Sequence, residues 1–235
     1  MRNNDLPIAL NKNNYKFPDV DKACKNPNGL LAVGGDLAMP RLIEAYRNGI
    51  FPWYSDGQPL LWWSPDPRAV LYLDKLKVSR SLKKTIKQNK FRITIDQAFY
   101  EVVEACATIP RQGQEGSWIT LEMQHAYAQL YRARYAHSIE AWYNDELAGG
   151  LYGICIGPYF FGESMFSRQT DASKVALFHL SELLKSYCFR FIDCQVPNPH
   201  LSSLGVSSIE RKVFIKDLKK HIDDPIDYAV WRETF

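Results

Sequence analysis

The segment HSIEAWYNDELAGGLYGICIGPYFFGESMF, residues 137–166, is the part of the sequence most indicative of the fold. It contains three largely apolar runs, His137–Trp142, Leu147–Ile156 and Tyr159–Phe166, which are separated by an Asn-Asp-Glu turn and a Gly-Pro turn. Apolar runs of this length, bounded by Asn, Asp, Gly and Pro, are typical of hairpin-connected strands. The segment therefore predicts a meander of three antiparallel strands.

A helix and one more strand are predicted after the meander. Asp171 can cap a helix from Ala172 to Tyr187, whose apolar residues recur on one face, and Phe189–Val196 has the composition of a strand. Three strands, a helix and a strand follow one another in the order of the GNAT acyltransferase core. Before the meander we expect strands at 69–73 and 91–95 and helices near 80–89, 97–107 and 121–134. The predicted fold class is α/β (α+β).

A smaller unit is predicted ahead of this core. Residues 17–63 are rich in Pro, Gly and Asn and contain one clear helix, from Pro40 to Asn48, with Gly49 placed as its stop. Pro65 and Pro67 mark a boundary. We expect a small N-terminal domain over residues 1–64 and a GNAT-like catalytic domain over residues 65–235.

Composition excludes several classes of protein. The 235 residues carry a net charge of +3, so any nucleic-acid signal must be local. Five cysteines without a C-x-x-C pair argue against a disulfide framework and a zinc site, and the histidines show no metal spacing. Gly29–Gly35 lacks the Lys-Ser/Thr of a phosphate loop. Since no signal-peptide or membrane-span pattern is present, we expect a cytoplasmic protein that needs no metal, no cofactor and no membrane.

Tryptophans gather in a Pro-punctuated segment, with Trp53 in Phe-Pro-Trp-Tyr and Trp62 and Trp63 shortly after it. Rings on a fixed loop are good stacking platforms for nucleobases. The alternative is a small aromatic core at a domain junction, because Trp is usually well buried. The sequence leaves both interpretations open.

A basic helix is predicted near 80–89. Residues 75–92 hold eight Lys or Arg and no acidic residue. Four of them share one face, opposite Leu82 and Ile86, and form what we call the basic stripe: Arg80, Lys83, Lys84 and Lys87. Such a stripe can meet the phosphates of a nucleic acid, or it can be an ordinary solvated helix face.

Two polar features interrupt apolar strands. Strict alternation puts Phe161, Glu163 and Met165 on one face, so the Glu163 carboxylate should be partly desolvated. It must then gain proton affinity or find a cationic partner, for which Arg168 is a candidate. Asp193 and Gln195 are two residues apart and share a face, where they could form a polar dent that holds an amine. Alternatively they are a solvated strand end.

Several short motifs together resemble the leucyl/phenylalanyl-tRNA–protein transferase family. They occur in family order over about 17–205. They are the segments Gly29–Leu37, Gly49–Tyr54, Trp62–Arg68, Gly116–Thr120, His137–Glu140, Gly162–Ser167 and Asp193–Gln195. The resemblance implies a GNAT-like enzyme that uses no acetyl-CoA. Such an enzyme transfers Leu or Phe from charged tRNA to proteins whose first residue is Lys or Arg, in the N-degron pathway.

The resemblance also implies roles for individual residues. Trp53 and Trp118 match the pair that brackets the terminal adenosine, and Glu163, Asp193 and Gln195 match the catalytic polar centre. Leu151 stands where relatives often carry Met. The residues that would bind the substrate side chain are Tyr46, Tyr127, Leu151, Phe160 and Ile192. An aminoacyl ester is already activated, so no ATP site is needed, and Asp193 could orient the acceptor amine with Gln195 positioning it.

Two other functions remain open. One is a CoA-dependent N-acetyltransferase, although the segment Ser167–Lys174 before the long helix has no glycine to wrap a pyrophosphate. The other is a non-catalytic RNA-binding module. It would explain the basic stripe and the tryptophans but would leave Glu163 and the Asp193–Gln195 pair without a role.

Overall fold

The computed structural model describes residues 6–109 and 118–235, so Gly116 and Ser117 of the quoted motif lie outside the described residues. The predicted meander is confirmed: β7 (Ala136–Tyr143), β8 (Glu146–Ile156) and β9 (Tyr159–Ser167) pair in antiparallel order. The helix α5 (Ala172–Ser186) then crosses over to β10 (Phe191–Gln195), which lies parallel to β9. This is the predicted GNAT-like order.

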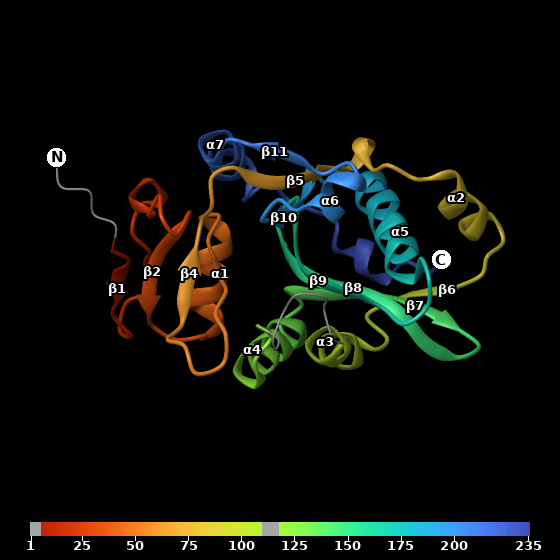
Figure 1. Ribbon diagram of the computed structural model, residues 1–235, viewed down its shortest axis with the longest axis horizontal. Coiled ribbons are helices and arrows are strands. Elements are labelled where there is room, and N and C mark those ends of the chain that lie inside the picture. Colours follow the sequence, from red (N-terminus) through yellow and green to blue (C-terminus); the bar gives the residue numbers. More distant parts are fainter. Residues whose placement is uncertain (1–5, 110–117) are drawn as a thin grey trace.

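The large sheet contains seven strands in the order β11-β5-β10-β9-β8-β7-β6. Its remaining strands are β5 (Arg68–Tyr72), β6 (Arg92–Ile95) and β11 (Ser207–Ile209). The helices α3 (Phe99–Thr108) and α4 (Leu121–Arg132) cover one face, and α5 covers the other, as Figure 1 shows. Two apolar cores result, one on each face of the sheet.

Short elements complete the body of the protein. The helix α2 (Arg80–Lys87) packs against α5 through Leu82, and Ser79 caps it by accepting a hydrogen bond from the Leu82 amide. Other short elements are the helices α6 (Pro199–Ser203) and α7 (Arg211–His221) and the 3-10 turns Leu73–Lys75 and Tyr228–Arg232.

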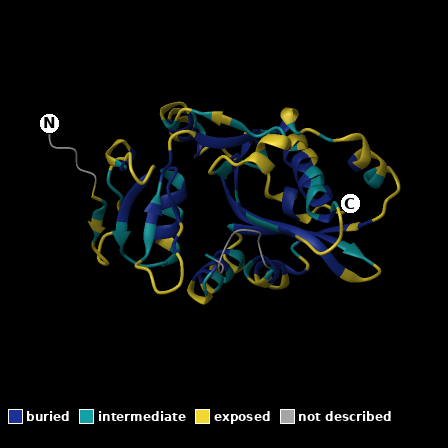
Figure 2. Cartoon of the chain, in the orientation of Figure 1, coloured by how far each residue is buried: buried dark blue, intermediate teal, exposed yellow. Residues whose placement is uncertain are grey.

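The N-terminal part forms a separate four-stranded sheet in the order β1-β2-β4-β3. Its elements are β1 (Ile8–Leu10), the 3-10 turn Val20–Lys22, β2 (Leu30–Gly34), α1 (Met39–Arg47), β3 (Phe51–Pro52) and β4 (Leu61–Trp63). Helix α1 lies between this sheet and the body, where it contacts α4 and β8, and residues of both parts belong to one apolar core. Figure 2 colours most of α1 as buried or intermediate. Because the two sheets share no strand, we propose the domain division after residue 64.

Two local expectations were wrong. A bulge between Tyr152 and Gly153 of β8 shifts the pairing with β9, so Glu163 is an extra residue. Met165 therefore belongs to the core on the opposite side from Phe161.

Asp171 does not cap α5 with its side chain. It has a φ of 70°, and its carboxylate pairs with Lys174 instead. The Ser167 hydroxyl takes the capping role instead, because it accepts a hydrogen bond from the backbone N–H of Ser173 in the first turn of α5.

Within the described part of the chain, no helix combines the length and the apolar character needed to cross a bilayer.

Candidate active site

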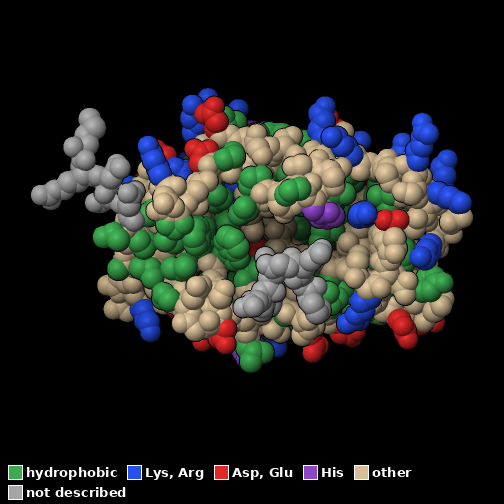
Figure 3. Space-filling view, viewed as in Figure 1, with side chains coloured by type: hydrophobic (Ala, Val, Ile, Leu, Met, Phe, Trp, Pro, Cys, Tyr) green, Lys and Arg blue, Asp and Glu red, His purple; other side chains and the backbone are tan. Residues whose placement is uncertain are grey.

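A cavity opens where β9 and β10 separate. The two strands pair only from Phe191 opposite Tyr159 to Asp193 opposite Phe161. Beyond this point β9 continues along β8, while β10 ends at Gln195. The space left between them is a cavity of about 840 Å³, visible as a hollow in the middle of the face in Figure 3. A splayed pair of parallel strands thus produces the site, because it exposes strand ends that would otherwise be bonded to each other.

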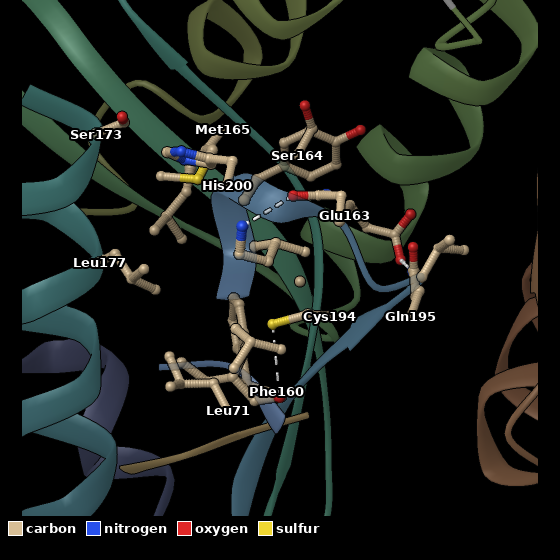
Figure 4. Close-up of a pocket in the computed structure, with 18 of the residues that line it drawn as sticks. Leu71, Phe160, Glu163, Ser164, Met165, Ser173, Leu177, Cys194, Gln195 and His200 are labelled. Carbon is tan, nitrogen blue, oxygen red and sulfur yellow. Dashed lines mark hydrogen bonds between the residues drawn. The ribbon is translucent and has the colours of Figure 1, made fainter. Parts of the chain in front are cut away.

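Most of the cavity wall is apolar. Phe160, Leu151 and Ile192, predicted to bind a substrate side chain, all line it, and each is at least 95% buried. Figure 4 shows Phe160 and Leu71 at one end, with Leu177 reaching in from α5. Part of this wall was not predicted from the sequence, because its residues resemble ordinary core positions: Leu71, Met165, Leu177, Leu180 and Cys194.

Trp53 and Trp118, predicted to bracket a base, both line the mouth of this cavity. Trp53 is 38% exposed and meets Trp63 edge to face, with ring centroids 5.7 Å apart. Trp62 instead is fully buried and donates its ring N–H to the Gly34 carbonyl oxygen at 2.9 Å. The core interpretation is thus confirmed for Trp62, whereas base stacking on the partly exposed Trp53 stays a prediction.

Glu163 lies at the polar end of the cavity and is only 8% exposed. Its carboxylate accepts hydrogen bonds from Tyr46 at 2.8 Å, from Tyr127 at 2.5 Å and from the Gln195 amide at 2.8 Å. Burial raises the pKa of Glu163 to about 7, although the two tyrosine hydroxyls oppose this change. The expected gain in proton affinity is confirmed, and Arg168 is not the partner, because its guanidinium donates to the Leu147 carbonyl.

Tyr46 and Tyr127 stand behind Glu163 and do not line the cavity. Both are fully buried, and their hydroxyl oxygens lie 3.2 Å apart. Burial and the Glu163 carboxylate raise the pKa of both tyrosines well above its usual value, so both remain hydroxyl donors. The geometry gives these two residues contact with Glu163 and not with an apolar substrate side chain.

Asp193 is completely buried and does not line the cavity, so the alternative of a solvated strand end is wrong. Arg68, at the start of β5, donates Nε to Oδ1 at 2.8 Å and a terminal nitrogen to Oδ2 at 2.6 Å. The same guanidinium donates to the Gly49 carbonyl and lies between the rings of Phe51 and Phe214. Arg68 had no assigned role in the sequence. The signal that could have indicated its role is its position at the start of an apolar strand. A cation at such a position is expected to be buried, and a buried cation requires a carboxylate partner.

Gln195 connects the two carboxylates. A bulge follows Asp193, and Gln195 has a φ of 63°, in the left-handed region. Its backbone N–H donates to Asp193 Oδ1 at 2.9 Å, and its side-chain amide donates to Glu163 across the cavity. Figure 4 shows Glu163 and Gln195 meeting at one end of the cavity. While the amide nitrogen donates to Glu163, the amide oxygen can accept a hydrogen bond from a ligand.

The basic stripe lies away from the cavity, on α2. All four side chains are exposed, and among residues 6–109 and 118–235 none of them forms an ion pair. Figure 3 shows Lys and Arg side chains gathered at the α2 end of the molecule. Leu82 is buried beneath the helix and Ile86 is half-buried, so the predicted anchoring face is confirmed.

Comparisons with known proteins give a consistent result. A family model described as "Leucyl/phenylalanyl-tRNA protein transferase" matches residues 70–219, and the model of that family's N-terminal domain matches residues 35–66. A protein of Pseudomonas syringae with the name leucyl/phenylalanyl-tRNA–protein transferase is 54% identical over 94% of this chain and 96% of its own. A protein of the same name from Chromobacterium violaceum is 53% identical over 92% of each chain. Among solved structures, L-PGS from Bacillus licheniformis aligns with a TM-score of 0.38 at 10% identity, covering 69% of this chain and 52% of its own, which is too low to bear on the fold.

Proposed function

The chain belongs to the leucyl/phenylalanyl-tRNA–protein transferase family, and from this membership we propose how its cavity transfers Leu or Phe from aminoacyl-tRNA to an acceptor protein. The observation that carries the proposal is the contrast between the two ends of the cavity. The apolar end fits a Leu or Phe side chain, and the polar end presents the Gln195 amide held by Glu163. An aminoacyl ester placed between them has its carbonyl carbon beside Gln195.

The donor nucleotide enters at the mouth of the cavity. Trp53 and Trp118 hold the terminal adenine there by stacking, for which the exposed face of Trp53 is suited. The donor side chain lies against Phe160, Leu151 and Ile192. Burial of that side chain fixes the ester relative to the polar end, and such orientation is a large part of catalysis for a reaction between two bound groups.

Transfer requires only direct aminolysis. The acceptor α-amine has an ordinary pKa near ~8, so a reactive neutral fraction exists at pH 7. The amine nitrogen attacks the ester carbonyl carbon, the new C–N bond forms and the C–O bond to the ribose breaks. The amine gives up a proton and the leaving ribose oxygen gains one. The Gln195 amide oxygen accepts an N–H of the amine and holds its nitrogen toward the carbonyl carbon.

Asp193 acts through Gln195. Both Asp193 oxygens are bonded by Arg68, and Oδ1 also accepts the Gln195 backbone N–H. We therefore assign Asp193 the task of holding Gln195 in its left-handed conformation, and we give Glu163 that of orienting the amide. This revises the expectation that Asp193 itself contacts the amine.

The body of the tRNA is bound elsewhere. The basic stripe is exposed and forms no ion pair with any residue that the structure describes, which supports phosphate contacts outside the cavity that add affinity without touching the ester. The resemblance set out above implies acceptors whose first residue is Lys or Arg, and we propose these acceptors and a cytoplasmic site of action for this chain. The site is less suited to a CoA-dependent reaction. The pyrophosphate of CoA would bind at the start of α5, and the negatively charged Asp171 carboxylate lies there.

The test is transfer with defined donors and acceptors. The protein is incubated with Phe-tRNA or Leu-tRNA and a peptide that begins with Arg, and peptide mass is recorded. We expect a gain of one Phe or Leu residue. The same peptide with an acetylated α-amine should gain nothing, because its nucleophile is blocked, and a peptide that begins with Ala should gain little. Absence of transfer from every charged tRNA, or equal transfer to the acetylated peptide, would refute the proposal.

A further inference from the structure

The chain continues past the residues matched by the family model, which end at 219. Its last part forms the 3-10 turn Tyr228–Arg232. Val230 is fully buried and Trp231 is 9% exposed, and both belong to the core that also contains Phe160 and the residues of α5. In Figure 1 this dark blue segment lies between α5 and the large sheet. The C-terminal segment is thus part of the core on the cavity side of the sheet.

Trp231 contacts the cavity wall from behind. Its ring lies 5.8 Å from the ring of Phe160, centroid to centroid, at an angle of 38°, and 6.4 Å from that of Phe189. Phe160 lines the cavity, whereas Trp231 does not. Phe160 also has little room on its strand side, since a Cβ on Gly153 would lie 2.5 Å from its Cε1 atom. The Phe160 ring is therefore held between the cavity and Trp231.

Trp231 in turn is fixed by a third ring. It stacks on the imidazole of His137 with centroids 3.9 Å apart and an interplanar angle of 4°. The imidazole is held by Asp96 at Nδ1, 2.6 Å, and by the Arg134 carbonyl oxygen at Nε2, 3.2 Å. A ring stacked on an immobile partner cannot retreat without losing that contact. The position of Phe160 is thus set by a chain of contacts that starts outside the cavity.

We propose that Trp231 is a positioning residue for donor selectivity, which fixes the depth of the apolar end of the cavity by supporting Phe160. This inference rests on the proposed function, since it assigns the donor side chain to that end. Loss of the Trp231 ring gives Phe160 room to move back and deepens the pocket. A deeper pocket favours the larger Phe side chain over Leu, because selectivity among apolar side chains follows how well the wall fits them.

The experiment compares Trp231→Ala, Trp231→Phe and the parent with Leu-adenosine and Phe-adenosine donors, which omit the tRNA body. The readout is the ratio of kcat/KM for Phe to that for Leu, with an Arg-starting peptide in excess. We expect this ratio to rise on the order of tenfold in Trp231→Ala. In Trp231→Phe it should lie between the values of the parent and of Trp231→Ala. Tyr228→Ala is the matched control, because Tyr228 lies in the same turn and is 58% exposed, and its ratio should equal that of the parent.

The outcomes separate the two proposals. If the parent transfers neither residue from charged tRNA, the proposed function fails. If the parent is active and Trp231→Ala lowers kcat/KM for both donors by the same factor, Trp231 is merely structural and this inference is overturned. If Trp231→Ala does not fold, Trp231→Phe decides: an unchanged ratio in that folded variant overturns the inference as well.

Discussion

Replacing Arg68 with Met tests whether the buried Arg68–Asp193 pair organises the polar end of the cavity. Met fills part of the space of the Arg side chain but has no charge and no hydrogen-bond donor, so the substitution leaves the Asp193 carboxylate buried without its partner. Arg68 is 1% exposed and Asp193 is 0% exposed, and two hydrogen bonds of 2.8 and 2.6 Å join them. Breaking such a pair from one side costs about 3–5 kcal/mol of unfolding free energy.

A second variant isolates the unpaired charge. Arg68→Met combined with Asp193→Leu removes both charges and leaves the Gly49 carbonyl and the Gln195 amide without their side-chain partners. At about 1 kcal/mol for each lost hydrogen bond, the double variant should lose about 2 kcal/mol, less than the single variant. Both variants should lose transfer activity. The double variant lacks the Asp193 oxygen that accepts the Gln195 backbone N–H, and in Arg68→Met the Asp193 carboxylate that accepts it has lost the two hydrogen bonds that fix its position.

The molecule provides a matched control. Arg190 and Asp217 form a pair of the same bidentate geometry, but their side chains are 36% and 30% exposed. Arg190→Met should cost about 0–1 kcal/mol, because solvent can replace the lost partner. Urea unfolding at pH 7 measures all three variants. If Arg68→Met loses no more unfolding free energy than Arg190→Met, or if a folded Arg68→Met protein keeps full activity, the buried pair does not organise the polar end of the cavity.

Four further outcomes are expected. Trp53→Ala and Trp118→Ala should each weaken binding of an aminoacyl-adenosine analogue by about 1–3 kcal/mol in calorimetry, and unchanged affinity in folded variants would disprove base stacking. Changing the whole basic stripe to Gln should raise the KM for charged tRNA and flatten its salt dependence while sparing an aminoacyl-adenosine donor; equal salt slopes would contradict this. Gln195→Ala should lower kcat more than it changes donor KM, and an effect confined to KM would count against a role in placing the amine. The folded-state pKa of Glu163, about 7 against an ordinary 4.5, means that the folded state binds the extra proton, so this group makes stability fall as pH rises from about 4.5 to about 7. The melting temperature of Glu163→Gln should therefore fall less than that of the parent over this pH range. If the two proteins show the same pH profile, Glu163 does not contribute to the decline.

Much of the architecture follows from local patterns. The turns at Asn144 and Gly157 and the apolar runs beside them determine the meander, since strand alternation and turn chemistry act over a few residues. Leu82 and Ile86 likewise predicted the buried side of α2. The expectation for Met165 failed because a single bulge reverses the alternation, and a bulge depends on the neighbouring strand and has no local signature.

The candidate site divides in the same way. The desolvated Glu163 carboxylate was predicted from an acidic residue inside an apolar run, which is a property of the sequence alone. The place of Phe160 in the apolar wall was expected only from the resemblance to a known family. The partners of these residues were not predictable. Arg68 is separated from Asp193 by 125 positions, and Tyr46 from Glu163 by 117.

Local sequence patterns thus predict most of the strands and helices and the polar residues that interrupt them. Three features depend on the packed fold: β9 and β10 separate after Asp193, Asp193 is buried against Arg68, and Trp231 packs behind the cavity wall. The difference lies in the range over which the interactions act. Hydrogen-bonded turns and hydrophobic periodicity act between near neighbours, whereas the pairing of buried charges and the contact of rings depend on which distant segments the packed sheet brings together.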